Sequence, residues 1–132
     1  MFMLVYTGYR NAERDKVRAD LDTVFRRKGQ FKMLVGFDPE NWSPTGGDLW
    51  AYEWALERGI EVECHPAWWK VPELGKAAGV YRNGYMLGKA STEEDTGVLA
   101  HLHPQSRGAA GTARFAELVG FKVRKETSRF SG

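Results

Sequence analysis

The chain has 132 residues, enough for one compact domain and too few for two. Its composition, 42% hydrophobic and 27% charged, is typical of a globular protein and excludes disordered and fibrous classes. The formal net charge of +2 is too small to indicate a nucleic-acid partner, because duplex binders concentrate basic residues on one face.

The N-terminal segment predicts a strand followed by a helix. Phe2 to Thr7 is an apolar run of strand length. It lacks a basic start and reaches Arg10 too soon for a signal peptide or a membrane span. We therefore expect no membrane association. After this run, apolar side chains recur at helical spacing over residues 17–25, and Gly29 is expected to end this helix.

The remaining segments continue the alternation of strand and helix. Further strands are expected over residues 31–35, 60–64, 98–102 and 121–123, and further helices over residues 49–56, 77–90 and 112–119. Three glycines interrupt the pattern over 77–90, which weakens that helix. We expect one domain over residues 1–123 and a flexible C-terminal tail over 124–132.

Strict alternation of strand and helix predicts a parallel sheet, because each parallel connection needs a long crossover that a helix supplies. The expected fold class is therefore α/β, a three-layer doubly wound sheet of about five strands. In such sheets ligands bind beyond the carboxyl ends of the strands, where the strand order reverses. We therefore expect the functional residues in the loops that directly follow the strands.

The cysteine and the histidines give no sign of a metal or a disulfide. Cys64 is the single cysteine and has no internal partner, which fits a reducing cytoplasm. His65 lies at the end of the third expected strand, and His101 and His103 lie at the end of the fourth. A two-histidine site would need a third ligand, and no H-E-x-x-H pattern is present. We expect no metal and packed or rim histidines.

Three loops that follow strands combine glycine with a hydroxyl or a cation. They read TGYR at 7–10, TGGD at 45–48 and HPQSRGAAGT at 103–112. Glycine lets backbone N–H groups approach an anion closely, and the next helix adds a partial positive charge. The pattern predicts a nucleotide-like ligand. The alternative is ordinary turn chemistry, since Thr45 and Asp48 also have the spacing of a capping box.

Four ordered motifs give the chain a resemblance to a known superfamily. They are TGYR after the first strand, TGGDLWAYEWA on the second helix, AAGVYRNGYML on the third and GAAGT before the fourth. Together they resemble the SLOG superfamily of Rossmann-like proteins, most closely its small YspA and YpsA-like branch. The chain is more distantly similar to the LOG phosphoribohydrolases and the DprA proteins. The resemblance spans residues 4–123.

The resemblance implies a pocket for a nucleotide-derived ligand, with no bound cofactor. The ligand-binding positions that it implies are Thr7, Gly8, Arg10, Thr45, Gly46, Gly47, Asp48, Arg82, Asn83, Gly108, Gly111 and Thr112. Two departures from the family pattern stand out. Arg114 and Phe115 occupy positions where the LOG enzymes have an acid needed for glycosidic cleavage, and Ser43 stands where the family usually has glycine.

Asp48 and Arg82 each have two interpretations. Asp48 either contacts the ligand, by accepting two hydroxyl hydrogen bonds, or caps its helix. Arg82 lies on a largely apolar helix and needs an anionic partner, either a ligand phosphate or an internal carboxylate such as Asp48. A phosphate matches the planar geometry of the guanidinium and is the favoured partner. Arg10 and Arg107 are either ligand contacts or solvated residues.

The tryptophans indicate buried surfaces. Trp50 and Trp54 share one face of the second helix as core or dimer contacts, and Trp68 and Trp69 either stack on a base or close the sheet edge. Because the helix over residues 49–56 carries aromatic side chains on most sides, we expect a homo-oligomer.

Three functions remain open at this stage. The first is binding of a nucleotide-derived small molecule by a sensor or sequestering protein, in nucleotide signalling or anti-phage defence, the context that SLOG relatives suggest. The second is N-glycosidic hydrolysis of nucleotides, with Asp48 or Glu53 as the catalytic acid. The absence of an acid at Arg114 and Phe115, where the LOG enzymes have one, counts against this function. The third is single-stranded nucleic-acid binding, which ranks last because the basic residues are scattered.

Overall fold

The protein is an α/β structure in which ten elements alternate along the chain. The computed structural model describes residues 1–40, 46–67, 70–92, 95–105 and 108–127. In chain order the elements are β1 (Met3–Gly8), α1 (Arg14–Lys28), β2 (Lys32–Val35), α2 (Gly47–Arg58), β3 (Glu61–Cys64), a 3₁₀ helix (Gly75–Ala77), α3 (Ala78–Ala90), β4 (Thr96–Leu102), α4 (Gly108–Leu118) and β5 (Val123–Thr127).

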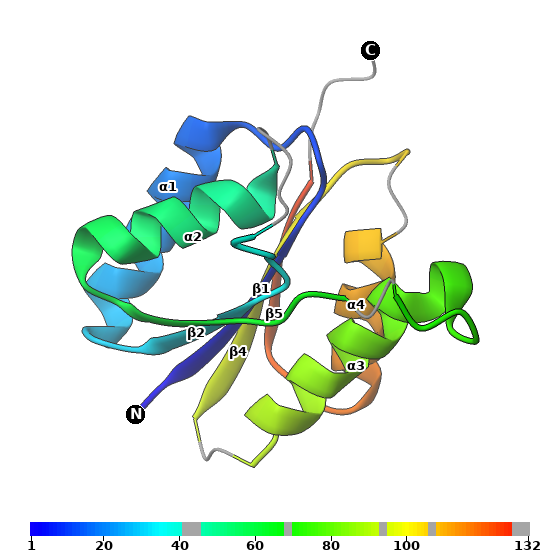
Figure 1. Cartoon of the computed structure of the whole chain (residues 1–132). Helices are drawn as coiled ribbons and strands as arrows, with labels where there is room; N and C mark the ends of the chain where they lie inside the picture. The colour runs from blue at the N-terminus through cyan, green and yellow to red at the C-terminus, as the bar shows by residue number, and fades with distance from the viewer. Residues whose placement is uncertain (41–45, 68–69, 93–94, 106–107, 128–132) are drawn as a thin grey trace.

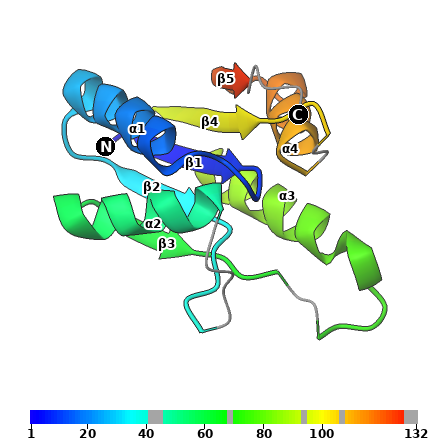
Figure 2. The same ribbon diagram turned by 90° about the horizontal axis from the view of Figure 1, so that it is seen from above.

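The five strands form one parallel sheet with the order β3-β2-β1-β4-β5 (Figure 2). The central strand β1 pairs with β2 on one side and with β4 on the other, so that Met3 lies opposite both Lys32 and Thr96. The chain builds outward from β1 to β3 and then returns to the other side of β1. The strand order therefore reverses between β1 and β4, which is the place where doubly wound sheets bind ligands.

Two helices cover each face of the sheet, as the sequence predicts (Figure 1). Leu4 and Tyr6 of β1 pack in the core under α1 and α2. Met3 and Val5 of the same strand pack in the second core, under α3 and α4. Successive side chains of a strand point to opposite faces, so a continuous apolar run such as residues 2–6 belongs in a strand buried on both sides.

The glycine predicted to end the first helix does so, and a second glycine ends the next helix. Gly29 caps α1 with φ of 70°, and Gly59 caps α2 with φ of 68°. A positive φ is strained for residues that carry a Cβ, which is why glycine suits these two positions. The backbone N–H of Ile60 then donates to the carbonyl of Ala55 at 2.9 Å and closes the end of α2.

The predicted bounds of α4 and β5 are wrong. Helix α4 begins at Gly108 rather than Thr112, so the GAAGT segment is its first turn and not a loop. Strand β5 runs from Val123 to Thr127, where we expected a flexible tail from residue 124. Residues 124–127 belong to the sheet because they pair with β4, from Leu99↔Arg124 to Leu102↔Thr127. These pairings are long-range and leave little trace in local sequence.

The aromatic side chains of α2 are used within the protomer. Trp54 is fully buried, and its ring stacks on Phe31 with centroids 6.0 Å apart. The Trp50 indole N–H donates to the carbonyl of Ala12 at 3.0 Å, and Tyr52 stacks on Phe37 at 4.6 Å. The reason we gave for a homo-oligomer is therefore removed, although the oligomeric state itself stays a prediction. Among the described residues, none of the helices combines the length and apolarity that crossing a bilayer requires.

Candidate functional site

The end of β1 and the start of α2 meet through two glycines. A Cβ on Gly47 would lie 3.0 Å from the Gly8 Cα and 2.6 Å from the Tyr6 hydroxyl, and a Cβ on Gly8 would meet the same hydroxyl at 2.5 Å. The Gly47 N–H also donates to the carbonyl of Tyr9 at 3.1 Å. Two of the three predicted loops, TGYR and TGGD, thus come together because neither glycine has a side chain to keep the backbones apart.

Asp48 points its carboxyl group into this junction. The carboxylate accepts the backbone N–H of Gly8, while its Oδ1 atom is buried and has no hydrogen-bond partner among the described residues. Burial raises the pKa of Asp48 to about 7, against the opposing effects of the Arg82 charge and the Gly8 hydrogen bond. An acceptor atom left unpaired in a buried place costs free energy, which a ligand with a hydroxyl or amine donor would recover.

The capping interpretation of Asp48 is wrong. The N-cap position of α2 is Gly46, with φ of 135°, and within the described part of the chain no side chain caps this helix. Asp48 is the second helical residue, and its carboxylate bonds back to β1 instead of to its own helix. The Asp48 carboxyl group is therefore held by a contact with β1, a segment distant in sequence, and not by its own helix.

Arg82 joins the carboxyl ends of two neighbouring strands. Its Nη1 atom donates to the carbonyl of Gly36 at 2.9 Å, after β2, and to the carbonyl of His65 at 3.1 Å, after β3. Its charge also acts on Asp48, and burial lowers the pKa of the guanidinium. The protein itself therefore supplies carbonyl acceptors and the internal carboxylate that the sequence left open as a partner, and a ligand phosphate stays a prediction.

Gly36 is a site residue that the sequence reasoning missed. A Cβ at this position would lie 2.5 Å from the Arg82 Cζ and 2.6 Å from its Nη1, so any side chain would displace the guanidinium. Gly36 directly follows the apolar strand β2, as Gly8 ends β1. A glycine at the carboxyl end of a strand near a switch point was the signal that could have identified it.

A line of hydrogen bonds continues from Arg82 to α4. The Arg82 Nε donates to the Asn83 Oδ1 at 2.6 Å, and the Asn83 Nδ2 donates to the Thr112 Oγ1 at 2.7 Å. Thr112 in turn donates to the carbonyl of Gly108, at 3.2 Å. The R-N pair of α3 and the G-T pair of α4, which are distant in sequence, are thus brought together.

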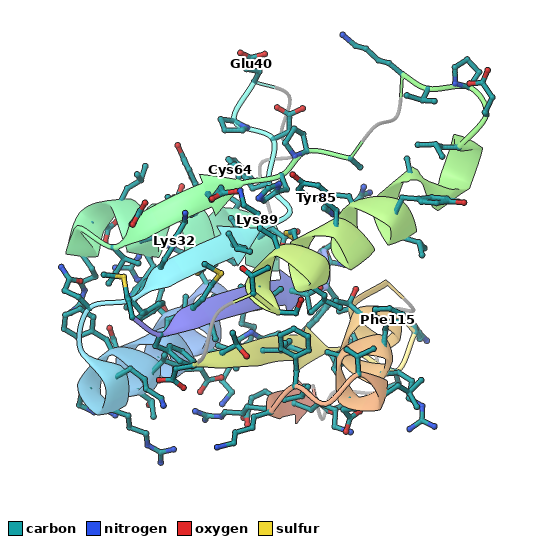
Figure 3. The ribbon with its side chains drawn as sticks, turned by 90° about the horizontal axis from the view of Figure 1, so that it is seen from below. Lys32, Glu40, Cys64, Tyr85, Lys89 and Phe115 are labelled. Atoms are coloured by element: carbon teal, nitrogen blue, oxygen red, sulfur yellow. The ribbon has the colours of Figure 1, made fainter. Side chains whose placement is uncertain are left out.

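A cavity of about 530 Å³ lies between α3 and α4 beside this line of hydrogen bonds. It is lined by Gly79, Val80, Arg82, Asn83, Gly84, Leu87, Gly108, Gly111, Thr112 and Phe115. Ligand sites in proteins typically measure about 300–1,000 Å³, so this volume suits a small molecule. The lining divides into a polar part at Arg82, Asn83 and Thr112 and an apolar part at Val80, Leu87 and Phe115. Figure 3 shows Phe115 on α4 and Tyr85 on α3.

Glycines create the cavity. A Cβ placed on Gly84, Gly108 or Gly111 would meet nothing within 4 Å. Glycine in a helix interior costs about 0.5–1 kcal/mol relative to alanine, and here no neighbouring protein atom requires it. The space beside these glycines is accordingly available to a molecule that is not part of the chain.

Three of the predicted site residues lie outside both this cavity and the junction between β1 and α2. Thr7 is buried on β1, on the face of Met3 and Val5 that carries α3 and α4. Arg10 is exposed, although its carbonyl lies near Gly46. Glu53 is half-buried on α2, five residues after Asp48, so it points about 140° away around the helix. Of the described residues that line the cavity, none is a carboxylate.

The histidines do not converge. His65 bonds to Glu63 at 2.8 Å, His103 packs on Tyr9 with ring centroids 5.3 Å apart, and His101 is buried on the opposite face from the cavity. Within the described residues, no group of three His, Cys, Asp or Glu side chains has the geometry of a metal site. Cys64 has no disulfide partner, and burial raises the pKa of its thiol.

Several predicted positions lie outside the described residues. They are Ser43, Thr45, Trp68, Trp69 and Arg107. Of the other candidates, Gly8, Gly46, Gly47 and Asp48 form the junction between β1 and α2, and Arg82, Asn83, Gly108, Gly111 and Thr112 line the cavity. Arg82 connects the two groups through its charge on Asp48.

Comparison with known proteins finds no family model that matches this chain and no curated protein similar to it in sequence.

Proposed function

We propose that this protein binds a nucleotide-derived small molecule in the cavity between α3 and α4, as the resemblance to SLOG proteins suggests. The observation that supports the proposal most strongly is the coincidence of three features at the switch point. These are a glycine-lined cavity, the half-buried Arg82 guanidinium on its wall and the nearby Asp48 carboxyl, one oxygen of which has no partner among the described residues. Each feature costs stability without a ligand, and a ligand would offset that cost.

The cavity suggests how such a ligand is held. The first turn of α4 contributes backbone N–H groups that no helical carbonyl can accept, together with a partial positive charge. Arg82 and Asn83 lie across the cavity from Gly108 and Gly111, so a phosphate fits between the two helices. Val80, Leu87 and Phe115 offer apolar surface to a base, while Asp48 offers an acceptor to a ribose hydroxyl.

A second candidate function is N-glycosidic hydrolysis, and one observation favours it. Because the pKa of Asp48 is raised to about 7, its carboxyl can exchange a proton at neutral pH, as a general acid or base must. The described lining of the cavity offers no carboxylate to act beside Asp48, and Arg114 and Phe115 stand where the LOG enzymes have theirs. We therefore rank a binder, acting as a sensor or a sequestering protein, above a hydrolase.

Calorimetric titration with nucleoside 5′-monophosphates, a cyclic nucleotide and ADP-ribose tests the proposal. Mass spectrometry of molecules retained through native purification guides the choice of probe. We expect one of these probes to bind, and Gly84→Val to weaken its affinity about 100-fold, because the added methyl groups fill the cavity. Chromatography of the same mixtures separates the two functions, since release of free base requires the hydrolase.

The matched control is Gly88→Val, one turn further along α3. Gly88 also has open space around its Cβ position but does not line the cavity. The two variants carry the same change in helix propensity, so only Gly84→Val should affect binding. Equal loss of affinity in both variants, or no loss in Gly84→Val, would place the ligand elsewhere.

A further inference from the structure

On the face of the sheet that carries α1 and α2, the helices leave part of the surface open. Helix α1 lies beside β1 and β4, and β5 extends beyond it at the edge of the sheet (Figure 2). Leu99 of β4 packs in the core under α1, and Arg124 of β5 contacts α1 directly. Because side chains two apart on a strand share a face, Gly97 and Lys122 belong to the same side.

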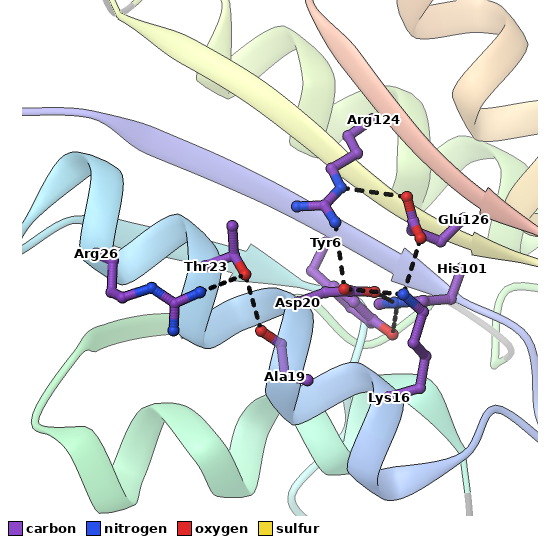
Figure 4. Close-up of polar contacts among 9 residues, drawn as sticks. All are labelled: Tyr6, Lys16, Ala19, Asp20, Thr23, Arg26, His101, Arg124 and Glu126. Carbon is purple, nitrogen blue, oxygen red and sulfur yellow. Dashed lines mark hydrogen bonds and ion pairs between the residues drawn. The ribbon is translucent and has the colours of Figure 1, made fainter.

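At the carboxyl ends of the strands, a buried chain of polar side chains fastens α1 to the sheet. The His101 Nε2 lies 2.7 Å from the Asp20 Oδ2, and the His101 Nδ1 lies 2.8 Å from the Tyr6 hydroxyl (Figure 4). Arg124 of β5 donates to the Asp20 Oδ1 at 3.3 Å. Asp20, His101 and Tyr6 are all buried. This polar chain leaves no comparable opening between the N-terminal half of α1 and the sheet.

At the amino ends of the same strands, a groove of about 280 Å³ lies between the C-terminal half of α1 and the sheet. Its apolar surface includes Phe2, Leu4, Val24 and Leu99. The sheet contributes Gly97, which has no side chain to occupy the space. The volume is close to the lower end of the range of about 300–1,000 Å³ that ligand sites span, so the groove suits a small molecule.

The walls of the groove are held in place without a ligand. The Phe2 ring packs edge-on against Phe31 with centroids 6.1 Å apart, and the Lys28 Nζ lies 4.6 Å above the Phe2 ring. On the sheet side, the Val98 N–H donates to the carbonyl of Lys122 at 2.9 Å. The groove is therefore preformed, and a ligand does not have to order it.

The charges around the groove are mostly positive. Four cations line it, Arg27, Lys28, Lys122 and Arg124, against one carboxylate, Asp95, which pairs with Lys28 at 3.6 Å. The formal net charge of the whole chain is only +2, so positive charge is concentrated here. Cations in the last turn of a helix are favoured by its dipole, which accounts for Arg27 and Lys28 but not for the two cations next to α1 on the sheet.

Two of these cations have their charge compensated by the protein, and two do not. Arg124 pairs with Asp20 at 3.3 Å and with Glu126 at 3.2 Å (Figure 4). Arg27 and Lys122, by contrast, have no acidic partner among the described residues. They come from α1 and from the start of β5, the two walls of the groove. An apolar groove with an uncompensated cation on each wall is complementary to a molecule with an apolar body and an anionic head group.

We propose that this groove binds a small aliphatic carboxylate, a fatty acid of medium length. The carboxylate pairs with Arg27 and Lys122, because a guanidinium matches the two oxygens of a carboxylate and an ammonium adds a second charge. The hydrocarbon chain lies on Leu4, Val24 and Leu99, which are aliphatic themselves. The groove lies on the other face of the sheet from the nucleotide cavity and at the opposite ends of the strands, so this proposal does not rest on the proposed function.

Calorimetric titration with octanoate, hexanoate, acetate and 1-octanol tests the proposal. Octanoate should bind saturably, and hexanoate about tenfold more weakly, because it buries two fewer methylene groups. Acetate lacks the apolar body and 1-octanol lacks the charge, so each should bind at least tenfold more weakly than octanoate. Octanol that binds as tightly as octanoate would show that the cations play no part and would overturn the proposal, as would the absence of saturable octanoate binding.

Nuclear magnetic resonance locates the bound octanoate. We expect its addition to shift the backbone amide signals of Gly97 and Val123, which line the groove, and to leave those of Gly84 and Gly111, which line the nucleotide cavity, in place. Shifts confined to Gly84 and Gly111 would place the fatty acid between α3 and α4 and overturn the proposal. Loss of nucleotide binding in other experiments would leave this result unchanged.

Two lysines on the same strand supply a matched pair of variants. Lys122→Gln removes an uncompensated cation from the groove and should weaken octanoate binding about tenfold. Lys125→Gln makes the same change on the other face, where Lys125 pairs with Glu117 of α4 at 3.2 Å, and should leave the affinity within twofold. Equal losses in the two variants would show a general effect of net charge and overturn the proposal.

Arg27→Gln repeats the test from the other wall of the groove. Arg27 and Lys122 are both exposed, so neither variant should lower the melting temperature by more than a few degrees. Arg27→Gln should also weaken octanoate binding about tenfold, and it decides the proposal if Lys122→Gln does not fold. Octanoate affinity that stays at the wild-type value in Arg27→Gln would show that the head group does not lie between the two cations.

Discussion

The two faces of the sheet are packed in different ways. Under α1 and α2 the core contains large buried side chains such as Trp54, Tyr6, Phe31 and Leu21. Under α3 and α4 the core is smaller, and the helices leave a cavity lined by glycines. The large apolar side chains that are exposed on α3 and α4 are Val80, Tyr81, Tyr85, Phe115 and Leu118. We expect the first face to provide most of the stability, whereas the second face leaves a cavity and exposed apolar surface.

The largest expected effect tests the stabilising face. Trp54→Ala should lower the free energy of unfolding by about 4 kcal/mol, because it removes a buried indole that stacks on Phe31 and donates to Asp22 at 2.9 Å. Chemical denaturation at neutral pH measures the change. A loss below about 2 kcal/mol would show that the core under α1 and α2 is not the main source of stability.

An intermediate effect is expected at Asp48, which belongs to the site although it lies on α2. Asp48→Asn should raise the free energy of unfolding at pH 8 by about 2 kcal/mol, because it removes a buried ionised carboxyl. The sign follows from the raised pKa. Between about pH 4 and 7 the folded protein holds a proton that the unfolded chain has released, so the contribution of Asp48 to stability falls as pH rises through that window.

Urea denaturation of the wild-type and Asp48→Asn proteins at several pH values measures both effects. The difference between the two should be small near pH 4 and largest above pH 7, and the variant should bind nucleotide more weakly. A variant that is less stable at pH 8 would mean that Asp48 stabilises the fold through Arg82 more than its burial costs.

The smallest expected effect concerns the glycines of the cavity. Gly84→Ala and Gly111→Ala should each raise the free energy of unfolding by about 0.5–1 kcal/mol, since alanine favours the helix and its methyl group meets no protein atom. Thermal unfolding detects such a shift. The same variants should bind the ligand more weakly, so stability and affinity should change in opposite directions. A fall in stability would mean that the cavity has less room than its geometry indicates.

Local sequence was sufficient to predict the order of the strands and α-helices, although not the 3₁₀ helix Gly75–Ala77. Phe2 to Thr7 could be assigned to a strand because apolar runs of that length suit a strand buried on both faces, and β1 is such a strand. Gly29 could be assigned to the end of the first helix because a positive φ is a local property. The α/β class and the parallel sheet followed from that alternation.

Only the tertiary structure decided which residues from distant parts of the sequence are in contact. Asp20 and Tyr6 meet His101 across 81 and 95 positions of sequence, and Arg82 meets Gly36 across 46. No periodicity encodes such pairs, because they depend on how strands and helices pack once the chain has folded. The extent of β5 was misplaced for the same reason, because it is set by pairing with β4. The sequence determined the elements through local conformational preference, and packing between distant segments determined the cavity, the buried carboxyl and the polar chain behind it.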